Sequence, residues 1–295
     1  METEVFNGNK FAQQQLVKIK AEVSLLAKKG IIPRIATLVF VDDPASRLYT
    51  QFKRQAAEQV GVKFQAHEFR LSDDFDKIKT AIDQANLDKS VTGVMIQKPA
   101  QAVWQADYQI HDQSSQNFGG WWQSLVSLIN PHKDIDGLHP TTLEAIKNNL
   151  WQKQGRVLPA TAQAVLDILD ESPFRSGMKT VIVGRSDIVG LPIYYELQNR
   201  GEQPELLGRL DFIKRQQSAS KLLDADVVIT ATGVPGLIKG EMLKMGVILI
   251  DAGEPKPDVD RSSIKEKTIF LTPVPGGVGP VTVACLMKNV LTMVQ

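Results

Sequence analysis

Short apolar runs alternate with helix-like segments along the first third of the chain, and this order restricts the fold more than any other feature. The apolar runs predict strands over residues 34–41, 62–69 and 92–97. The segments before and between them predict helices over residues 11–29, 43–61 and 74–86. Elements in this order form a parallel sheet with helical crossovers. Ligands of such sheets lie at the carboxyl ends of the strands, where Asp42, Asp43 and Gln97 fall.

The same order begins again in the second half of the chain. Strands are predicted over residues 179–183, 225–230, 247–250 and 269–271. Helices are predicted over residues 161–170 and 191–200, with a closing helix that ends near residue 293. A chain of 295 residues is long enough for two domains. We therefore predict an α/β fold with two domains.

Residues 99–130 interrupt this pattern. They are rich in Gln, Ser and Trp, and their periodicity is weak. A loop of this length in a compact domain is usually functional or mobile. The segment is therefore predicted to be a loop inserted over the ligand cleft.

The composition restricts the class of protein and its location. Lys plus Arg number 34 and Asp plus Glu number 33, which argues against a dedicated nucleic-acid binder with a basic face. The single cysteine, Cys285, excludes an intramolecular disulfide, and its apolar surroundings predict a buried thiol. The first residues lack a secretory pattern, and no apolar run approaches the ~20 residues that span a bilayer. We expect a cytoplasmic protein with no membrane partner.

A glycine-containing turn, Gly184 to Gly190, joins a predicted strand to a predicted helix. Backbone N–H groups at a helix N-terminus attract phosphate, and Arg185 could add a charged contact. The pattern is close to GxGxxG without matching it. An ordinary turn with a surface arginine fits the spacing equally well. The small residues at 231–233 and 251–253 leave room for a flat ring, but such strand ends are common.

Tyr49 and Lys53 are four residues apart on a predicted helix and therefore share one face. A lysine that is partly desolvated can transfer protons. A solvated lysine beside a packing tyrosine is the commoner outcome, and the spacing alone favours it. Gln97 ends the third strand as either a ligand contact or a strand cap.

Two further segments have open interpretations. Residues 133–137, Lys-Asp-Ile-Asp-Gly, form either a divalent-cation loop or a solvated turn, and the solvated turn is favoured because no EF-hand pattern follows. His132 and His139 are expected at the surface or behind a site residue, and no metal is predicted. Residues 272–282, TPVPGGVGPVT, combine prolines that fix φ with glycines that free it. This run is either a rigid loop facing a ligand or a structural crossover.

Taken together, these segments resemble the bifunctional methylenetetrahydrofolate dehydrogenase/methenyltetrahydrofolate cyclohydrolase family. The matching pieces occur in the family's order and cover most of the chain: Tyr49-x-x-x-Lys53, Gly93 to Gln97 with Pro99, Lys133 to Gly137, Gly184-Arg185-Ser186 with Val189-Gly190-x-Pro192, Ala225-Asp226, and residues 272–282. The resemblance implies a folate-binding αβα domain over residues 1–145, completed by residues 276–295 as the C-terminal helix returns. It also implies a Rossmann-like NAD(P)-binding domain over residues 146–275.

The resemblance further implies the reactions and the residues that perform them. 5,10-Methylenetetrahydrofolate would be oxidised with NADP, or alternatively NAD, and the methenyl product hydrolysed to 10-formyltetrahydrofolate, in one-carbon metabolism and purine biosynthesis. Lys53 would be the general acid/base, with Tyr49, Gln97 and Asp136 as the other catalytic residues. The substrate-binding residues would be Tyr49, Gln97, Lys98, Pro99, Asp136, Pro275, Gly276 and Gly277. The cofactor-binding residues would be Gly184, Arg185, Ser186, Val189, Thr232, Gly233, Asp251, Gly279 and Thr282. Relatives of this family imply a homodimer.

The chain departs from the family pattern at three places. Gln97-Lys98-Pro99-Ala100 replaces the usual Q-x-P-L-P and adds a charge beside the folate. Residues 159–162 replace the usual P-C-T-P, and residues 201–221 lack the usual strand that ends in a His-Ser pair near the adenosine ribose. Two alternatives to the bifunctional enzyme follow: a cyclohydrolase with a weakened cofactor site, and a non-catalytic folate- or nucleotide-binding protein.

Overall fold

The computed structural model describes residues 2–111, 117–218, 221–264 and 266–294. The chain forms two compact units, each assembled from separate parts of the sequence. The three-stranded unit holds residues 15–144, 151–157 and 286–295, and the six-stranded unit holds residues 1–14, 145–150 and 158–285. The predicted α/β class with two parallel-sheet domains is confirmed. The predicted domain boundaries stay a prediction, and they differ from these units at residues 1–14, 145, 151–157 and 276–285.

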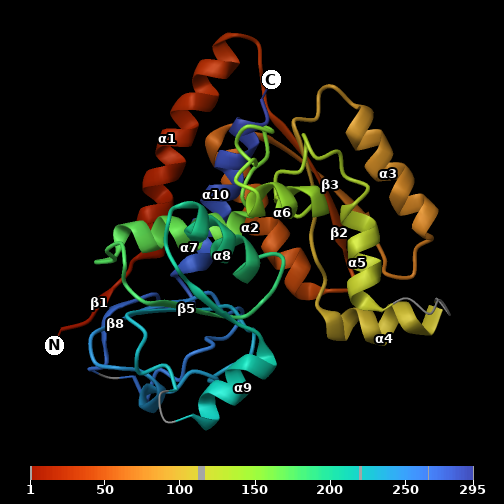
Figure 1. Cartoon of the computed structure of the whole chain (residues 1–295). Helices are drawn as coiled ribbons and strands as arrows, with labels where there is room; N and C mark the ends of the chain where they lie inside the picture. Colours follow the sequence, from red (N-terminus) through yellow and green to blue (C-terminus); the bar gives the residue numbers. More distant parts are fainter. Residues whose placement is uncertain (1, 112–116, 219–220, 265, 295) are drawn as a thin grey trace. The chain divides into compact units, whose positions relative to one another are not determined.

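The three-stranded unit is built on the sheet order β3-β2-β4, with all strands parallel. Its strands are β2 (Arg34–Phe40), β3 (Lys63–Phe69) and β4 (Gly93–Ile96), joined by the helices α2 (Pro44–Val60) and α3 (Phe75–Leu87) (Figure 1). All of these were predicted to within a few residues. Strand β2 is central, with β3 on one side and β4 on the other. The order in which strands are added to the sheet therefore reverses between β2 and β4, although all strands stay parallel. Open parallel sheets bind their ligands at such a point.

The prediction of a loop over residues 99–130 is wrong. The described part of this segment forms two helices, α4 (Gln101–His111) and α5 (Phe118–Val126), while residues 112–116 lie outside the described residues. Trp104, Trp121 and Trp122 are buried in one apolar cluster with Phe40 of β2 and Ile82 of α3. The tryptophans therefore belong to the core of the three-stranded unit, because large aromatic side chains gain most from leaving water.

Three helices have residues in both units. They are α1 (Gly8–Lys28), α6 (Pro140–Lys147) and α10 (Val278–Thr292). The first part of α10 belongs to the six-stranded unit and its last part to the three-stranded unit. The predicted return of the C-terminal helix is therefore confirmed.

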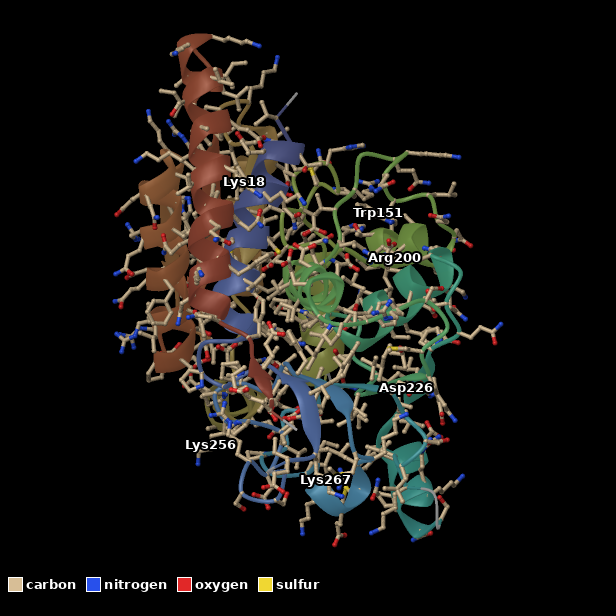
Figure 2. The ribbon with its side chains drawn as sticks, turned by 90° about the vertical axis from the view of Figure 1, so that its left-hand side faces the viewer. Lys18, Trp151, Arg200, Asp226, Lys256 and Lys267 are labelled. Atoms are coloured by element: carbon tan, nitrogen blue, oxygen red, sulfur yellow. The ribbon has the colours of Figure 1, made fainter. Side chains whose placement is uncertain are left out.

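The six-stranded unit is a parallel sheet in the order β1-β9-β8-β7-β5-β6. Its strands are β1 (Glu4–Val5), β5 (Thr180–Val183), β6 (Glu205–Leu207), β7 (Val227–Thr230), β8 (Val247–Asp251) and β9 (Thr268–Leu271). Its other elements are the helices α7 (Ala160–Glu171), α8 (Gly190–Asn199) and α9 (Arg209–Gln217) and the 3₁₀ turn η1 (Gly240–Met242). Strands β5, β7 and β8 are buried throughout, as expected of a sheet covered on both faces. Arg200 after α8 and Asp226 before β7 are labelled in Figure 2.

The sequence analysis missed two strands of this sheet. Residues 201–221 do contain a strand, β6, which pairs with β5, although it ends in Leu207-Gly208 and not in a His-Ser pair. Residues 219–220 of this segment lie outside the described residues. The two residues of β1 pair with β9 at the opposite edge. The order in which strands are added to the sheet reverses between β5 and β7. Ligands are therefore expected at the carboxyl ends of these two strands.

Candidate active site

Lys53 lies on α2 and faces two oxygen acceptors. Its Nζ donates a hydrogen bond to Oε1 of Gln97 at 3.0 Å and lies 3.6 Å from Oδ2 of Asp136. The Lys53 and Asp136 side chains are only 12% and 17% exposed. The interpretation of Lys53 as a solvated surface lysine is therefore wrong, and Gln97 is not merely a strand cap. Three side chains from a helix, a strand end and a turn meet at one amine.

Asp43 fixes the elements that carry Lys53 and Gln97. It is the N-cap of α2, where its Oδ1 accepts from the Ala45 N–H at 3.0 Å. Its Oδ2 accepts from the Ser46 hydroxyl at 2.8 Å and from the Ala100 N–H at 2.9 Å. The sequence analysis identified Asp43 as a helix start, but it gave no sign of the second contact.

The turn at residues 133–137 places Asp136 beside β4. Asp134 is bridged to Val94, and Gly93 lies so close to Ile135 that a Cβ on the glycine would be 2.2 Å from Ile135 Cγ2. Lys133 donates to the carbonyl groups of Ala85 at 3.0 Å and Asp88 at 2.7 Å. The turn is therefore anchored on α3 and β4, which excludes a freely solvated turn.

Asp134 is the buried carboxyl group of this turn. Its Oδ2 accepts from the His139 N–H at 2.7 Å, and its Oδ1 has no hydrogen-bond partner among the described residues. Burial raises the pKa of Asp134 to about 6, against the hydrogen bonds from backbone N–H groups that lower it. His139 thus supports the turn through its backbone. Among the described residues, no group of three or more His, Cys, Asp or Glu side chains is placed to hold a metal ion.

The last helix also supports this turn. Asn289 of α10 is buried and donates from Nδ2 to the carbonyl oxygen of Ile135 at 2.9 Å. Cys285, on the same helix, is buried as predicted. The C-terminal helix therefore positions the residue that precedes Asp136.

Tyr49, Lys98 and Pro99 are the other predicted substrate-binding residues of the three-stranded unit. Tyr49 is half-buried one turn before Lys53, and Pro99 is buried after Gln97. The Lys98 ammonium lies 5.5 Å from the ring centre of Phe118 and 5.2 Å from that of Trp122. The charge that distinguishes this chain from its family is thus held against the rings of α5.

The turn between β5 and α8 requires its glycines. Gly184 has φ +120°, and a Cβ there would lie 2.3 Å from the carbonyl oxygen of Ala231, which follows β7. A Cβ on Gly190 would lie 1.8 Å from the Gly184 carbonyl oxygen. Helix α8 begins without a side-chain cap. The turn is therefore a tight backbone cradle before a helix N-terminus, which fits the pyrophosphate of a dinucleotide.

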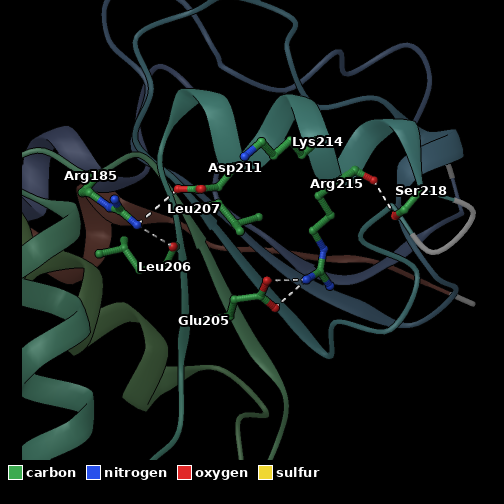
Figure 3. A pocket seen from close by; sticks show the side chains of 8 residues that line it. All are labelled: Arg185, Glu205, Leu206, Leu207, Asp211, Lys214, Arg215 and Ser218. Carbon is green, nitrogen blue, oxygen red and sulfur yellow. Dashed lines mark hydrogen bonds and ion pairs between the residues drawn. The ribbon is translucent and has the colours of Figure 1, made fainter.

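Arg185 and Ser186 lie on this turn with different surroundings. The Ser186 hydroxyl accepts from the Val189 N–H at 3.1 Å, which leaves its own hydrogen to donate. Arg185 extends to the end of β6, where its Nη2 lies 3.2 Å from Oδ2 of Asp211 (Figure 3). Arg185 and Asp211 both line a pocket of about 490 Å³ that the sequence analysis did not predict.

The remaining predicted cofactor residues follow the neighbouring strands. Thr232 and Gly233 come directly after β7, and Asp251 ends β8. The Asp251 carboxylate is buried and accepts from three backbone N–H groups, those of Gly253, Asp258 and Val259. Burial raises its pKa. This side chain therefore shapes the loop after β8 and does not reach solvent.

The run at residues 272–282 is a packed loop followed by the first turn of α10. Thr272 accepts from the Asp251 N–H at 2.7 Å, and a Cβ on Gly277 would lie 2.4 Å from the Pro273 carbonyl oxygen. Gly8, where α1 begins, donates to the Gly276 carbonyl at 3.0 Å. Within α10, Thr282 donates to the Val278 carbonyl at 3.2 Å, and a Cβ on Gly279 would lie 3.4 Å from Glu254 Oε1. Pro275 is exposed. Close packing within the six-stranded unit thus requires a glycine at 277, whereas a Cβ at 279 would make an ordinary contact.

No helix in the described part of the chain is both long enough and apolar enough to cross a membrane.

Comparison with known proteins assigns a domain of one family to each half of the chain. Residues 6–118 match the catalytic domain of tetrahydrofolate dehydrogenase/cyclohydrolase, and residues 159–295 match its NAD(P)-binding domain. The bifunctional protein FolD of Lactobacillus delbrueckii subsp. bulgaricus is 31% identical over 99% of this chain and 97% of its own length. That of Methanosarcina acetivorans is 34% identical over 98% of this chain and 96% of its own length.

The solved structures give the same result. The bifunctional FolD of Campylobacter jejuni has a TM-score of 0.84 at 27% identity, covering 99% of this chain and 98% of that one. The Trypanosoma brucei enzyme, solved with NADP and an inhibitor, has a TM-score of 0.85 at 27% identity, covering 99% and 97%. The chain belongs to the tetrahydrofolate dehydrogenase/cyclohydrolase family, and it is an NAD(P)-dependent methylenetetrahydrofolate dehydrogenase and methenyltetrahydrofolate cyclohydrolase of one-carbon metabolism.

Proposed function

We propose that Lys53 is the general acid/base of the cyclohydrolase reaction and that Gln97 and Asp136 hold its amine in place. The observation that carries this proposal is the meeting of the three side chains at distances of 3.0 and 3.6 Å. An ammonium group has three N–H donors. Gln97 and Asp136 each offer one acceptor, so one N–H remains for a substrate or a water molecule.

The proposed proton transfers follow from the chemistry of hydrolysis. A water oxygen bonds to the cationic methenyl carbon while Lys53, as the neutral amine, accepts a proton from that water and becomes the ammonium group. The bond from this carbon to the ring nitrogen then breaks, and Lys53 returns the proton to that nitrogen. The second water proton is released as the formyl group forms. A positioned amine typically accelerates such steps about 10²–10⁴-fold.

The substrate of this site is proposed to be a tetrahydrofolate derivative. Tyr49, on the same face of α2 as Lys53, would stack on the folate ring, and Asp136 would accept hydrogen bonds from the pterin. Lys98 and Pro99, which follow Gln97, would contact the same molecule. Pro275, Gly276 and Gly277 are proposed as further substrate contacts because they belong to the run that resembles the family.

The cofactor site is proposed at the carboxyl ends of β5, β7 and β8. The backbone cradle from Gly184 to Gly190 and the uncapped start of α8 would bind the pyrophosphate, with Ser186 donating its hydroxyl hydrogen. The other proposed contacts are Arg185, Val189, Thr232, Gly233, Gly279 and Thr282, and the buried Asp251 is proposed to act by shaping the loop after β8. When bound, NAD(P) accepts a hydride from the methylene bridge. The intact cradle favours the bifunctional enzyme over a cyclohydrolase with a weakened cofactor site.

The partners and the location of the protein are also proposed. The family implies a homodimer, and the nearly equal numbers of acidic and basic residues support neither nucleic-acid nor membrane binding. Light scattering tests the homodimer directly, because a monomeric mass at working concentration contradicts it. We also propose a cytoplasmic location and a contribution to purine biosynthesis.

The roles of Lys53 and the cofactor site are tested by separate assays. Wild-type protein should reduce NADP or NAD with methylenetetrahydrofolate and should hydrolyse methenyltetrahydrofolate. Lys53→Ala should abolish hydrolysis while folate binding stays measurable by calorimetry. Lys79→Ala, which removes an exposed lysine of α3 that pairs with Asp83, should retain both activities. Wild-type turnover in Lys53→Ala overturns the assigned role, and hydrolysis without reduction of either cofactor overturns the dehydrogenase.

A further inference from the structure

The pocket beside β6 lies where a dinucleotide-binding unit recognises the adenosine ribose. In such units the ribose lies beyond the strand that pairs next to the phosphate-binding strand. That strand is β6 here, and the pocket is lined by Arg185, Glu205, Leu206, Leu207, Asp211, Lys214, Arg215 and Ser218 (Figure 3). A hydroxyl at the ribose 2′ position distinguishes NAD from NADP, which carries a phosphate there. The charges of this pocket therefore decide between the two cofactors.

Two arginines line the pocket, and both are paired with carboxylates. Arg215 donates from Nη1 to both carboxylate oxygens of Glu205 and from Nη2 to Asp224. It also donates to the carbonyl of Lys221 at 2.6 Å. Arg215 is therefore held within the sheet and helix of its own unit and is not directed to a ligand.

Asp211 neutralises the other arginine. Its Oδ2 lies 3.2 Å from Nη2 of Arg185 and accepts from the Gly208 N–H at 3.1 Å. Gly208 is the N-cap of α9, and its N–H is one of the groups that would otherwise bind a phosphate oxygen. The Arg185 guanidinium and this N–H thus already share one carboxylate oxygen, while Lys214 is the third cation of the pocket.

We propose that Asp211 makes this cofactor site selective for the unphosphorylated ribose of NAD against the 2′-phosphate of NADP, an inference that rests on the proposed cofactor site. A 2′-phosphate would meet the negative charge of Asp211 and would have to compete with it for Arg185. A ribose diol has no such penalty and can donate a hydrogen bond to the carboxylate. Charged groups of the same sign near one site provide specificity by repelling the wrong ligand.

The Arg185 and Asp211 side chains are 54% and 44% exposed, so salt screens this repulsion. The discrimination should therefore weaken as the salt concentration rises. A site that attracts the 2′-phosphate through its arginine shows the opposite behaviour, because salt weakens its hold on the doubly charged group. Whether the preference for the unphosphorylated nucleotide falls or rises with salt therefore distinguishes the two arrangements, without any measurement of activity.

The test compares 5′-AMP with 2′,5′-ADP, which differ only in the 2′-phosphate, as ligands in calorimetry with the full chain. Wild-type protein should bind 5′-AMP at least roughly tenfold more tightly at low salt, and the ratio should fall at high salt. Asp211→Asn keeps an acceptor for the Gly208 N–H but removes the charge, and Asp211→Ser keeps a capping hydroxyl. Both variants should lower the ratio by roughly tenfold.

The matched control is Asp170→Asn, which removes an exposed carboxylate paired with Arg200 at 3.1 Å in the same unit. It should leave the ratio unchanged. Tighter binding of 2′,5′-ADP by wild-type protein, or an unchanged ratio in both Asp211 variants, overturns the inference. If wild-type protein binds neither nucleotide, the proposed cofactor site itself fails, whereas binding of both with the wrong preference leaves that site intact and rejects only the role of Asp211.

Discussion

The carboxylate of Asp43 accepts a hydrogen bond from the backbone N–H of Ala100 at 2.9 Å, although 57 residues separate them. This bond joins the first turn of α2 to the segment that follows β4. Lys53 lies on the first element and Gln97 on the second, so the bond limits the distance between the amine and its acceptor. Asp43 therefore acts as a positioning residue for the proposed acid/base.

We expect Asp43→Ala to lower both stability and hydrolysis. The substitution removes a helix N-cap and leaves the Ala100 N–H without its acceptor, which should cost about 2 kcal/mol in the free energy of unfolding. Turnover of the methenyl substrate should fall because Gln97 and Lys53 are no longer held together. Asp74→Ala removes the N-cap of α3 alone and is the control. Urea titration and initial rates distinguish the two, and equal turnover in both variants contradicts the positioning role.

Gln97→Leu should reduce hydrolysis at least roughly tenfold with little loss of folding, because the amine loses an acceptor that orients it. The substitution keeps the approximate size of the side chain. Gln65→Leu on β3 changes an exposed glutamine of the same unit and should leave the rate unaffected. Rates measured across a range of pH values should show a displaced profile for Gln97→Leu. An unchanged profile at full rate shows that Gln97 does not act on Lys53.

Gly184→Ala should remove cofactor binding and destabilise the six-stranded unit. Its Cβ would lie 2.3 Å from the Ala231 carbonyl oxygen, and φ +120° is strained for any residue with a side chain. Gly177→Ala has φ +86° but no atom within 4 Å of the new Cβ. It should cost only about 1–2 kcal/mol for its backbone conformation. Calorimetry with ADP should show binding by Gly177→Ala alone; binding of ADP by Gly184→Ala would mean that the cradle adapts.

The buried Asp134 predicts a dependence of stability on pH. Its pKa is raised from 3.8 to about 6, so the folded state holds a proton that the unfolded state has lost between these values. Stability from this group is present below pH 3.8 and is lost as the pH rises through about 6.

Asp134→Asn should remove this part of the pH dependence, since it keeps an acceptor for the His139 N–H. Relative to the variant, wild-type protein should lose about 3 kcal/mol between these two pH values. Urea titrations of both proteins across the range give the difference. A flat difference, or one that grows with pH in favour of the wild type, rejects the raised pKa.

The sequence predicted most of the sheet but not the segment at 99–130. Buried strands such as 34–40 are unbroken apolar runs, and those are recognisable without tertiary contacts. In the 118–126 segment, Gly119 and Gly120 weakened the helical pattern that Trp121, Trp122 and Leu125 carry. The gain from burying these rings outweighs the low helix propensity of glycine. Strands β1 and β6 have only two and three residues, too few for a periodicity to be seen.

The sequence predicted residues of the candidate site but not the hydrogen bonds and ion pairs that position them. Lys53, Gln97 and Asp136 were found through resemblance, because helical spacing alone favoured a solvated lysine. Asp43, Asp211 and Asn289 act through partners far away in the sequence, at Ala100, Arg185 and Ile135. A polar residue in a sequence does not show which group it will bind. These roles became visible only when the fold placed the partners together.

The pairing of β1 with β9 has a consequence for how the protein is made. Glu4 and its partner Phe270 lie far apart in the chain, so the ribosome synthesises one long before the other. Domains generally fold as units during synthesis, with the N-terminal part first. Here β1 cannot pair until β9 has been synthesised. A nascent chain that stalls before β9 therefore lacks this edge of the nucleotide-binding sheet.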